Sequence, residues 1–100
     1  MLNYMDILYK INENMSEIKK YGVLKIGLFG SFAKNEQTEK SDIDILVQFE
    51  KTRETFENYM DLLIFLEALF SGKVDLVIYD NVRDELKSEI YGSVKYAEEL

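Results

Sequence analysis

The sequence predicts a small α/β domain, in which helices cover at least one face of a three-stranded or slightly larger sheet. Three short apolar runs bounded by glycine or polar residues indicate strands. Longer segments with apolar residues at spacings of three and four indicate helices. These elements follow one another as helix, strand, short helix, strand, helix, strand, helix. The 100 residues are expected to form one domain, residues 1–100.

The first half of the chain begins with one amphipathic helix, expected over residues 3–20 because apolar side chains recur at helical spacing. These side chains are Tyr4, Ile7, Leu8, Ile11, Met15 and Ile18. Gly22 is the expected residue just beyond the helix. A strand is predicted over residues 23–29, and Gly30-Ser31 then opens a short helix that is followed by a polar connection.

A second strand is predicted over residues 41–49, where side chains alternate between two faces. One face is wholly apolar and is expected in the core: Ile43, Ile45, Val47 and Phe49. The other face begins with two acids and becomes apolar further along: Asp42, Asp44, Leu46 and Gln48. The acids are therefore expected at one end of the sheet.

The second half of the chain reads as a long helix over residues 55–71 ended by Gly72, a strand over 73–79 and a last helix. The last helix is expected to be capped by Asp80 or Asn81 and to carry the following apolar stripe: Val82, Leu86, Ile90, Val94 and Ala97. The long helix is apolar on nearly all sides beyond its second turn. We expect its second face to meet another chain, a partner or a second copy; the alternative is that neighbouring strands cover it.

Composition excludes several functions. The chain has no His and no Cys, which removes zinc fingers, thiolate nucleophiles and Ser-His-Asp triads. Its net charge of −7 makes free nucleic acid an unexpected partner, since that affinity rests on Lys and Arg. No apolar run is long enough to span a membrane and no signal peptide is visible, so a cytoplasmic location is expected.

The two acids of the second strand are candidate metal ligands. At positions i and i+2, the residues Asp42 and Asp44 lie about 6.6–6.8 Å apart along one face, and two such carboxylates can bind one or two cations. Two solvated acids at a strand start are the simpler interpretation of this pair alone. Asp75, inside the apolar run 74–77, changes the balance, because a lone acid within a short strand is unusual. If the two strands are neighbours, three oxygen ligands suit Mg²⁺.

Gly30-Ser31 is a candidate phosphate-binding turn. A strand that ends in Gly-Ser and opens a helix presents backbone N–H groups and a hydroxyl to an anion. An ordinary turn with Ser as the helix cap explains the pair equally well on its own. Lys34, one turn further on, would place a positive charge near the phosphates, or is a solvated surface lysine.

Taken together, Gly30-Ser31, the Asp42-Ile43-Asp44 motif and the later Asp75 resemble the DNA-polymerase-β-like nucleotidyltransferase superfamily. The short length is similar to its minimal nucleotidyltransferases, the MntA-type antitoxins of HEPN–MNT toxin–antitoxin pairs. The resemblance implies a palm-like fold with a small mixed sheet of three to four strands. It also implies two Mg²⁺ ions held by Asp42, Asp44 and Asp75, with Asp75 helping to activate a hydroxyl. ATP would be held through its β- and γ-phosphates by Gly30 and Ser31.

The function expected from this resemblance is transfer of AMP from ATP to a hydroxyl, a tyrosine of the partner HEPN toxin, which silences the toxin. Two alternatives stay open: the same chemistry on a small-molecule hydroxyl, and an antitoxin that works by binding alone. The chain also departs from its relatives, many of which read Gly-Ser-x-Ala-Arg-Gly. Lys34 and Asn35 stand in the last two positions here, which bears on nucleotide grip and on the following turn.

Overall fold

A four-stranded mixed sheet forms the centre of the computed structural model, which describes residues 2–97. The strand order is β3-β2-β1-β4. β1 (Val23–Phe29) runs antiparallel to β2 (Ile43–Phe49) and to β4 (Lys95–Tyr96), whereas β3 (Val74–Ile78) runs parallel to β2. The predicted fold class is confirmed, with a fourth strand added to the three expected from the apolar runs.

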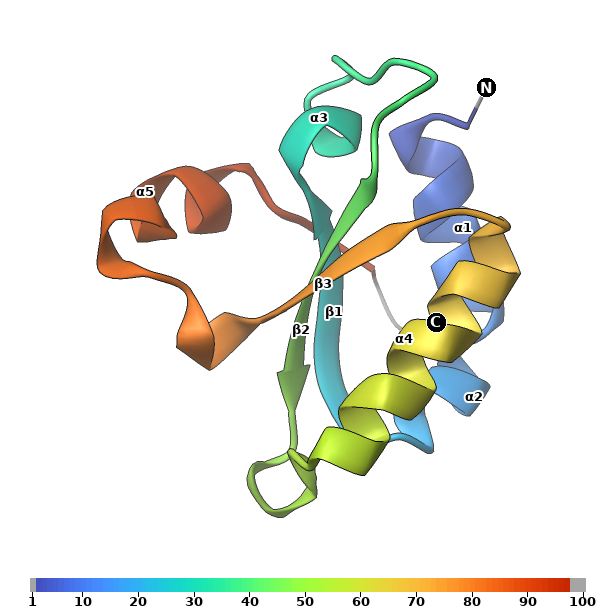
Figure 1. The fold of residues 1–100 in the computed structure, drawn as a ribbon, viewed down its shortest axis with the longest axis vertical. Helices are drawn as coiled ribbons and strands as arrows, with labels where there is room; N and C mark the ends of the chain where they lie inside the picture. The colour runs from blue at the N-terminus through green and yellow to red at the C-terminus, as the bar shows by residue number, and fades with distance from the viewer. Residues whose placement is uncertain (1, 98–100) are drawn as a thin grey trace.

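Helices cover the two faces of the sheet unequally. α1 (Tyr4–Glu13), α2 (Met15–Lys19) and α4 (Phe56–Phe70) lie together on one side, and α5 (Asp84–Ser93) lies on the other (Figure 1). The main core forms between the sheet and the helices α1, α2 and α4. Its fully buried members include Ile7, Ile11, Ile18, Ile45, Val47, Leu62 and Leu66. A smaller buried cluster on the other side contains Phe29, Leu46 and Val82.

The predicted alternation of β2 is confirmed. The residues expected in the core are all buried in the main cluster: Ile43, Ile45, Val47 and Phe49. Val74 and Leu76 of β3 are buried in the same cluster. The opposite face of β2 begins with the half-buried Asp44 and continues to the buried Leu46. The strand itself begins at Ile43, so Asp42 precedes it instead of lying within it.

The single N-terminal helix predicted over 3–20 is wrong, because Asn14 divides it into α1 and α2. The Asn14 side chain donates a hydrogen bond to the Lys10 carbonyl at 2.8 Å, and its own backbone leaves the helical region. An amide side chain that binds a nearby carbonyl in this way competes with the helical backbone. Gly22 has a φ of +87°, as expected for the residue that turns the chain out of the helix.

The C-terminal prediction is wrong at both ends of the helix. α5 begins at Asp84 with Arg83 as its N-cap, whereas the predicted caps Asp80 and Asn81 both lie in the 3₁₀ helix η2 (Tyr79–Asn81). The chain becomes extended at Val94, and β4 pairs with β1. The stripe from Val82 to Ala97 therefore does not lie on one helix.

The pairing partner explains why this end of the chain extends. β4 crosses Gly27, where a Cβ would lie only 2.8 Å from Val94 Cγ2 and 3.0 Å from the Lys95 carbonyl oxygen. The absence of a side chain on β1 thus lets the last segment approach its backbone closely. Lys95 also lies over the Tyr4 ring, 4.2 Å from its centroid. The residues that β4 contacts, Gly27 and Tyr4, are far from it in the sequence. The spacing of apolar residues within 82–97 therefore gives no information about these contacts.

The long helix α4 ends one residue earlier than expected. Ser71 takes the left-handed conformation at a φ of +51°, and the amide of the following Gly72 donates to the Glu67 carbonyl at 3.2 Å. Among the described helices, α4 included, none has the length and apolar character needed to cross a bilayer.

Candidate active site

The ends of three strands meet at one edge of the sheet. Because β1 and β2 are antiparallel, the last residue of β1, Phe29, pairs with Asp44 near the start of β2. Because β2 and β3 are parallel, Asp44 also pairs with Asp75 near the start of β3. The topology therefore brings together a turn and two acids that are far apart in the sequence.

Gly30 lies directly against the Asp44 carboxylate. Its φ of +71° is a left-handed conformation that suits glycine. A Cβ at this position would overlap Oδ2 of Asp44 and lie 2.9 Å from its Cγ. The Gly-Ser turn and the predicted metal ligand Asp44 thus share one small space, which only a residue without a side chain leaves open.

Asp44 is the electrostatic centre of this edge. Burial raises its pKa to about 6, and the charges of Asp75 and Asp42 and a hydrogen bond with the Asp75 side chain act in the same direction. Every one of these effects raises the pKa, because burial and neighbouring negative charges both favour the protonated carboxyl group. Within residues 2–97, no three metal-ligating side chains already converge on a single point. The sheet brings Asp44 and Asp75 into contact and places Asp42, exposed before β2, within electrostatic reach.

The remaining predicted site residues lie in or after α3 (Gly30–Ala33). Ser31 is half-buried in the first turn of α3, directly after Gly30. Lys34 follows α3 and forms an exposed ion pair with Glu89 of α5, with 3.2 Å between Lys34 Nζ and Glu89 Oε1. The role of Lys34 toward phosphate stays a prediction. Nothing in the sequence pattern pairs position 34 with position 89, so sequence reasoning missed this contact.

Asn35 resolves one of the departures from the Gly-Ser-x-Ala-Arg-Gly pattern. It adopts a φ of +59°, the left-handed conformation that a glycine would take at the same point. Asparagine tolerates this region better than other residues with a Cβ. The turn after α3 therefore keeps the backbone conformation that glycine favours.

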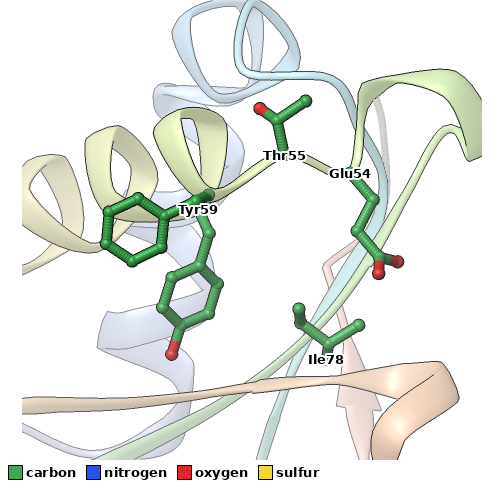
Figure 2. A pocket seen from close by; sticks show the side chains of 5 residues that line it. Glu54, Thr55, Tyr59 and Ile78 are labelled. Atoms are coloured by element: carbon green, nitrogen blue, oxygen red, sulfur yellow. The ribbon is translucent and has the colours of Figure 1, made fainter.

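A hollow of about 230 Å³ lies apart from these residues, between the start of α4 and the end of β3 (Figure 2). It is lined by Glu54, Thr55, Phe56, Tyr59 and Ile78. None of the predicted site residues contributes to it.

Comparison with known proteins places this geometry in a family. The model of the family described as polymerase beta, nucleotidyltransferase, matches residues 9–96. The chain belongs to this nucleotidyltransferase family. The prediction that it is an enzyme of the nucleotidyltransferase class is confirmed.

Two archaeal relatives show how near the similarity lies. A protein of Methanocaldococcus jannaschii, provisionally named a protein adenylyltransferase, is 47% identical over 79% of this chain and 78% of its own length. The protein adenylyltransferase MntA of Thermococcus cleftensis is 33% identical over 96% of this chain and 97% of its own length. This nucleotidyltransferase is thus similar to MntA along almost its whole described length.

Solved structures agree on the fold. A protein provisionally described as a minimal nucleotidyltransferase superposes with a TM-score of 0.80 at 26% identity, covering 94% of this chain and 95% of its own. A toxin–antitoxin structure with AMP-PNP has a TM-score of 0.69 at 23% identity, covering 89% and 73%. A tri-AMPylated HEPN toxin of Shewanella oneidensis in complex with its MNT antitoxin gives 0.66 at 21%, covering 94% and 73%. The last two identities are low, so these two structures establish the shared fold alone.

Proposed function

We propose that this nucleotidyltransferase transfers AMP from ATP to a tyrosine hydroxyl of a partner HEPN toxin and acts as the antitoxin of the pair. The observation that carries the proposal is the contact of Gly30 with Asp44, which joins the turn expected to hold phosphates to the acids expected to hold metal. The relative named protein adenylyltransferase MntA supports a protein acceptor. The structures of a toxin–antitoxin with AMP-PNP and of an AMPylated HEPN toxin support the nucleotide and the partner.

In this proposal, Asp42, Asp44 and Asp75 hold two Mg²⁺ ions. Carboxylate oxygens are the ligands that Mg²⁺ prefers, and it completes its shell with water and substrate phosphates. Burial and the charges of Asp75 and Asp42 raise the pKa of Asp44, and a cation bound between these acids would offset the repulsion. Neutralisation of phosphate charge is the chemistry that the ions supply when bound.

The chain's own residues then orient the reactants. Gly30 and Ser31 hold the β- and γ-phosphates, and Lys34 adds a positive charge beside them. The acceptor oxygen attacks the α-phosphorus of ATP and forms a new P–O bond, while the bond from the α-phosphorus to the bridging oxygen breaks. Pyrophosphate leaves with that electron pair, and Asp75 receives the proton of the attacking hydroxyl.

A docking surface for the toxin is proposed on the outer side of α4. Phe56 is 80% exposed and Ile64 is 60% exposed, although both are large apolar side chains. The acids Glu57 and Asp61 lie on the same helix, and no Lys or Arg occurs between Glu54 and Gly72. Two copies joined through this surface would oppose like charges, whereas an apolar surface with basic residues complements it.

The test combines the purified protein with Mg²⁺, ATP and the product of the adjacent gene, which is then weighed by mass spectrometry. We expect a mass increase of one or more AMP units. The increase should disappear in Asp42→Ala with Asp44→Ala and should persist in Asp84→Asn, an exposed acid of α5. An unmodified partner that still binds the double variant would instead establish an antitoxin that acts by binding alone. Modification of only a small molecule would refute the protein acceptor.

A further inference from the structure

The third carboxylate of the site, Asp75, stands on an edge strand of the sheet. β3 lies at one edge of the sheet and pairs only with β2 among the described strands. The amide of Ile43 donates to the Lys73 carbonyl at 3.1 Å, so the backbone of residue 73 faces β2. Successive residues of a strand point their N–H and C=O groups to opposite sides. The N–H and C=O groups of Val74 and Leu76 therefore point away from β2, toward the open edge. The two residues that flank Asp75 therefore have free ladder positions on their outer side.

Two side chains of α4 fill these outer positions. The Tyr59 hydroxyl donates a hydrogen bond to the Leu76 carbonyl at 2.6 Å, and the Val74 amide donates to Glu67 Oε2 at 3.2 Å. Figure 2 shows the Tyr59 ring reaching from α4 toward β3. Both bonds are partly buried, which makes them stronger than equivalent bonds at the surface. They bracket Asp75 on both sides along the chain.

We infer that Tyr59 and Glu67 are positioning residues that clamp β3 and thereby fix the Asp75 carboxylate beside Asp44. The inference rests on the proposed function of this site, in which Asp75 is a metal ligand and proton acceptor. Their hydrogen bonds go to the backbone on either side of Asp75, so each acts through that backbone. An edge strand without such support frays more readily, and a ligand about 1 Å out of place costs far more activity than stability.

The chain offers a matched control for the tyrosine. Tyr91 of α5 donates its hydroxyl to the Tyr79 carbonyl at 2.7 Å, also partly buried. Tyr91→Phe therefore removes a bond of the same kind and length, four residues beyond Asp75. For Glu67, the conservative variant Glu67→Gln keeps an oxygen that accepts from the Val74 amide, whereas Glu67→Ala removes it.

The experiment measures Mn²⁺ binding to the full-length protein by electron paramagnetic resonance, together with amide hydrogen exchange by NMR and kcat and KM for ATP. In Tyr59→Phe and Glu67→Ala, we expect Mn²⁺ binding about 3- to 10-fold weaker, the range that one lost hydrogen bond predicts. We also expect a lower kcat with little change in KM. Glu67→Ala should in addition speed exchange of the Val74 amide.

Glu67→Gln and Tyr91→Phe should bind Mn²⁺ like the original protein. The inference is overturned if Tyr59→Phe and Tyr91→Phe have the same affinity for Mn²⁺ and lose the same stability. Tyr59 would then stabilise the fold without positioning Asp75. It is also overturned if Glu67→Gln behaves like Glu67→Ala. If the original protein binds Mn²⁺ and the clamp variants weaken that binding but no AMP is transferred, the proposed function fails while the clamp stands.

Discussion

Replacement of Gly30 by alanine tests how tightly the phosphate turn and the metal ligands are coupled. The left-handed backbone at a φ of +71° costs a residue with a Cβ about 1–2 kcal/mol. The new Cβ also overlaps Oδ2 of Asp44 and lies 2.9 Å from its Cγ, so the carboxylate must move. A displacement of about 1 Å within a catalytic group costs about 100-fold in rate. We therefore expect a modest loss of stability and a loss of transfer of about 100-fold.

Gly22→Ala is the matched control for this change. Gly22 has a φ of +87°, and a Cβ there would lie 2.6 Å from Arg53 Cβ, so both the strain and the crowding are similar. Gly22 lies between α2 and β1, at the other end of β1 from Gly30. Urea unfolding should show both variants destabilised by about 1–2 kcal/mol or more. Release of pyrophosphate from ATP in the presence of the acceptor should fall only in Gly30→Ala.

The reasoning would be refuted if the two variants lost stability equally and kept equal rates of pyrophosphate release. That result would mean that Asp44 can leave the space beside Gly30 without cost to the reaction. A rate of pyrophosphate release that falls in both variants in proportion to the unfolded fraction would also count against a specific coupling between the Gly30 turn and Asp44.

Three further predictions concern pH, backbone conformation and packing. In metal-free protein, the raised pKa of Asp44 contributes stability that is fully present below about pH 4 and is lost as the pH rises through about 6. Urea unfolding should therefore give a lower free energy of unfolding above about pH 6 than below about pH 4, and this decrease should be smaller in Asp44→Asn. An equal decrease in the variant would contradict the prediction. A Cβ added to Gly92 of α5 would meet no described atom within 4 Å, so Gly92→Ala should raise the free energy of unfolding by about 0.5–1 kcal/mol, and a loss of stability would show a hidden contact. Leu66 is fully buried, so Leu66→Ala should lower the free energy of unfolding by about 2–5 kcal/mol. Ile64 is 60% exposed, so Ile64→Ala should change it by less than about 0.5 kcal/mol. Equal effects of the two variants in urea unfolding would refute the assigned orientation of α4.

Local pattern was sufficient wherever one short segment carries its own signal. The bounds of β1 were predicted to the residue, because glycines flank an apolar run on both sides. The two faces of β2 followed from strict alternation, which places acids and apolar residues on opposite sides without reference to other strands. The lone polar Glu67 in the apolar half of α4 was a visible signal as well, although only the fold shows that it accepts a hydrogen bond from Val74.

Local pattern failed where contacts between distant segments decide the conformation. Helical spacing carried the last helix through Ala97, but the chain is extended from Val94 onward, where it pairs with β1 across Gly27. Helical spacing also runs through Asn14 without interruption, yet its side-chain bond to Lys10 ends α1 there. A spacing of three and four residues shows which face of a segment is apolar. It does not show which backbone groups already have hydrogen-bond partners elsewhere in the structure.

The sequence by itself determined the chemistry available to this nucleotidyltransferase: carboxylates, a Gly-Ser turn and no His or Cys. It also determined that Asp42 and Asp44 stand at the start of a strand, because the alternation of that segment encodes this directly. Only the tertiary structure decided that Asp44 pairs with Asp75 and packs against Gly30. Strand register and the choice of neighbouring strands depend on the burial of whole faces by distant helices, and that is a property of the assembled core.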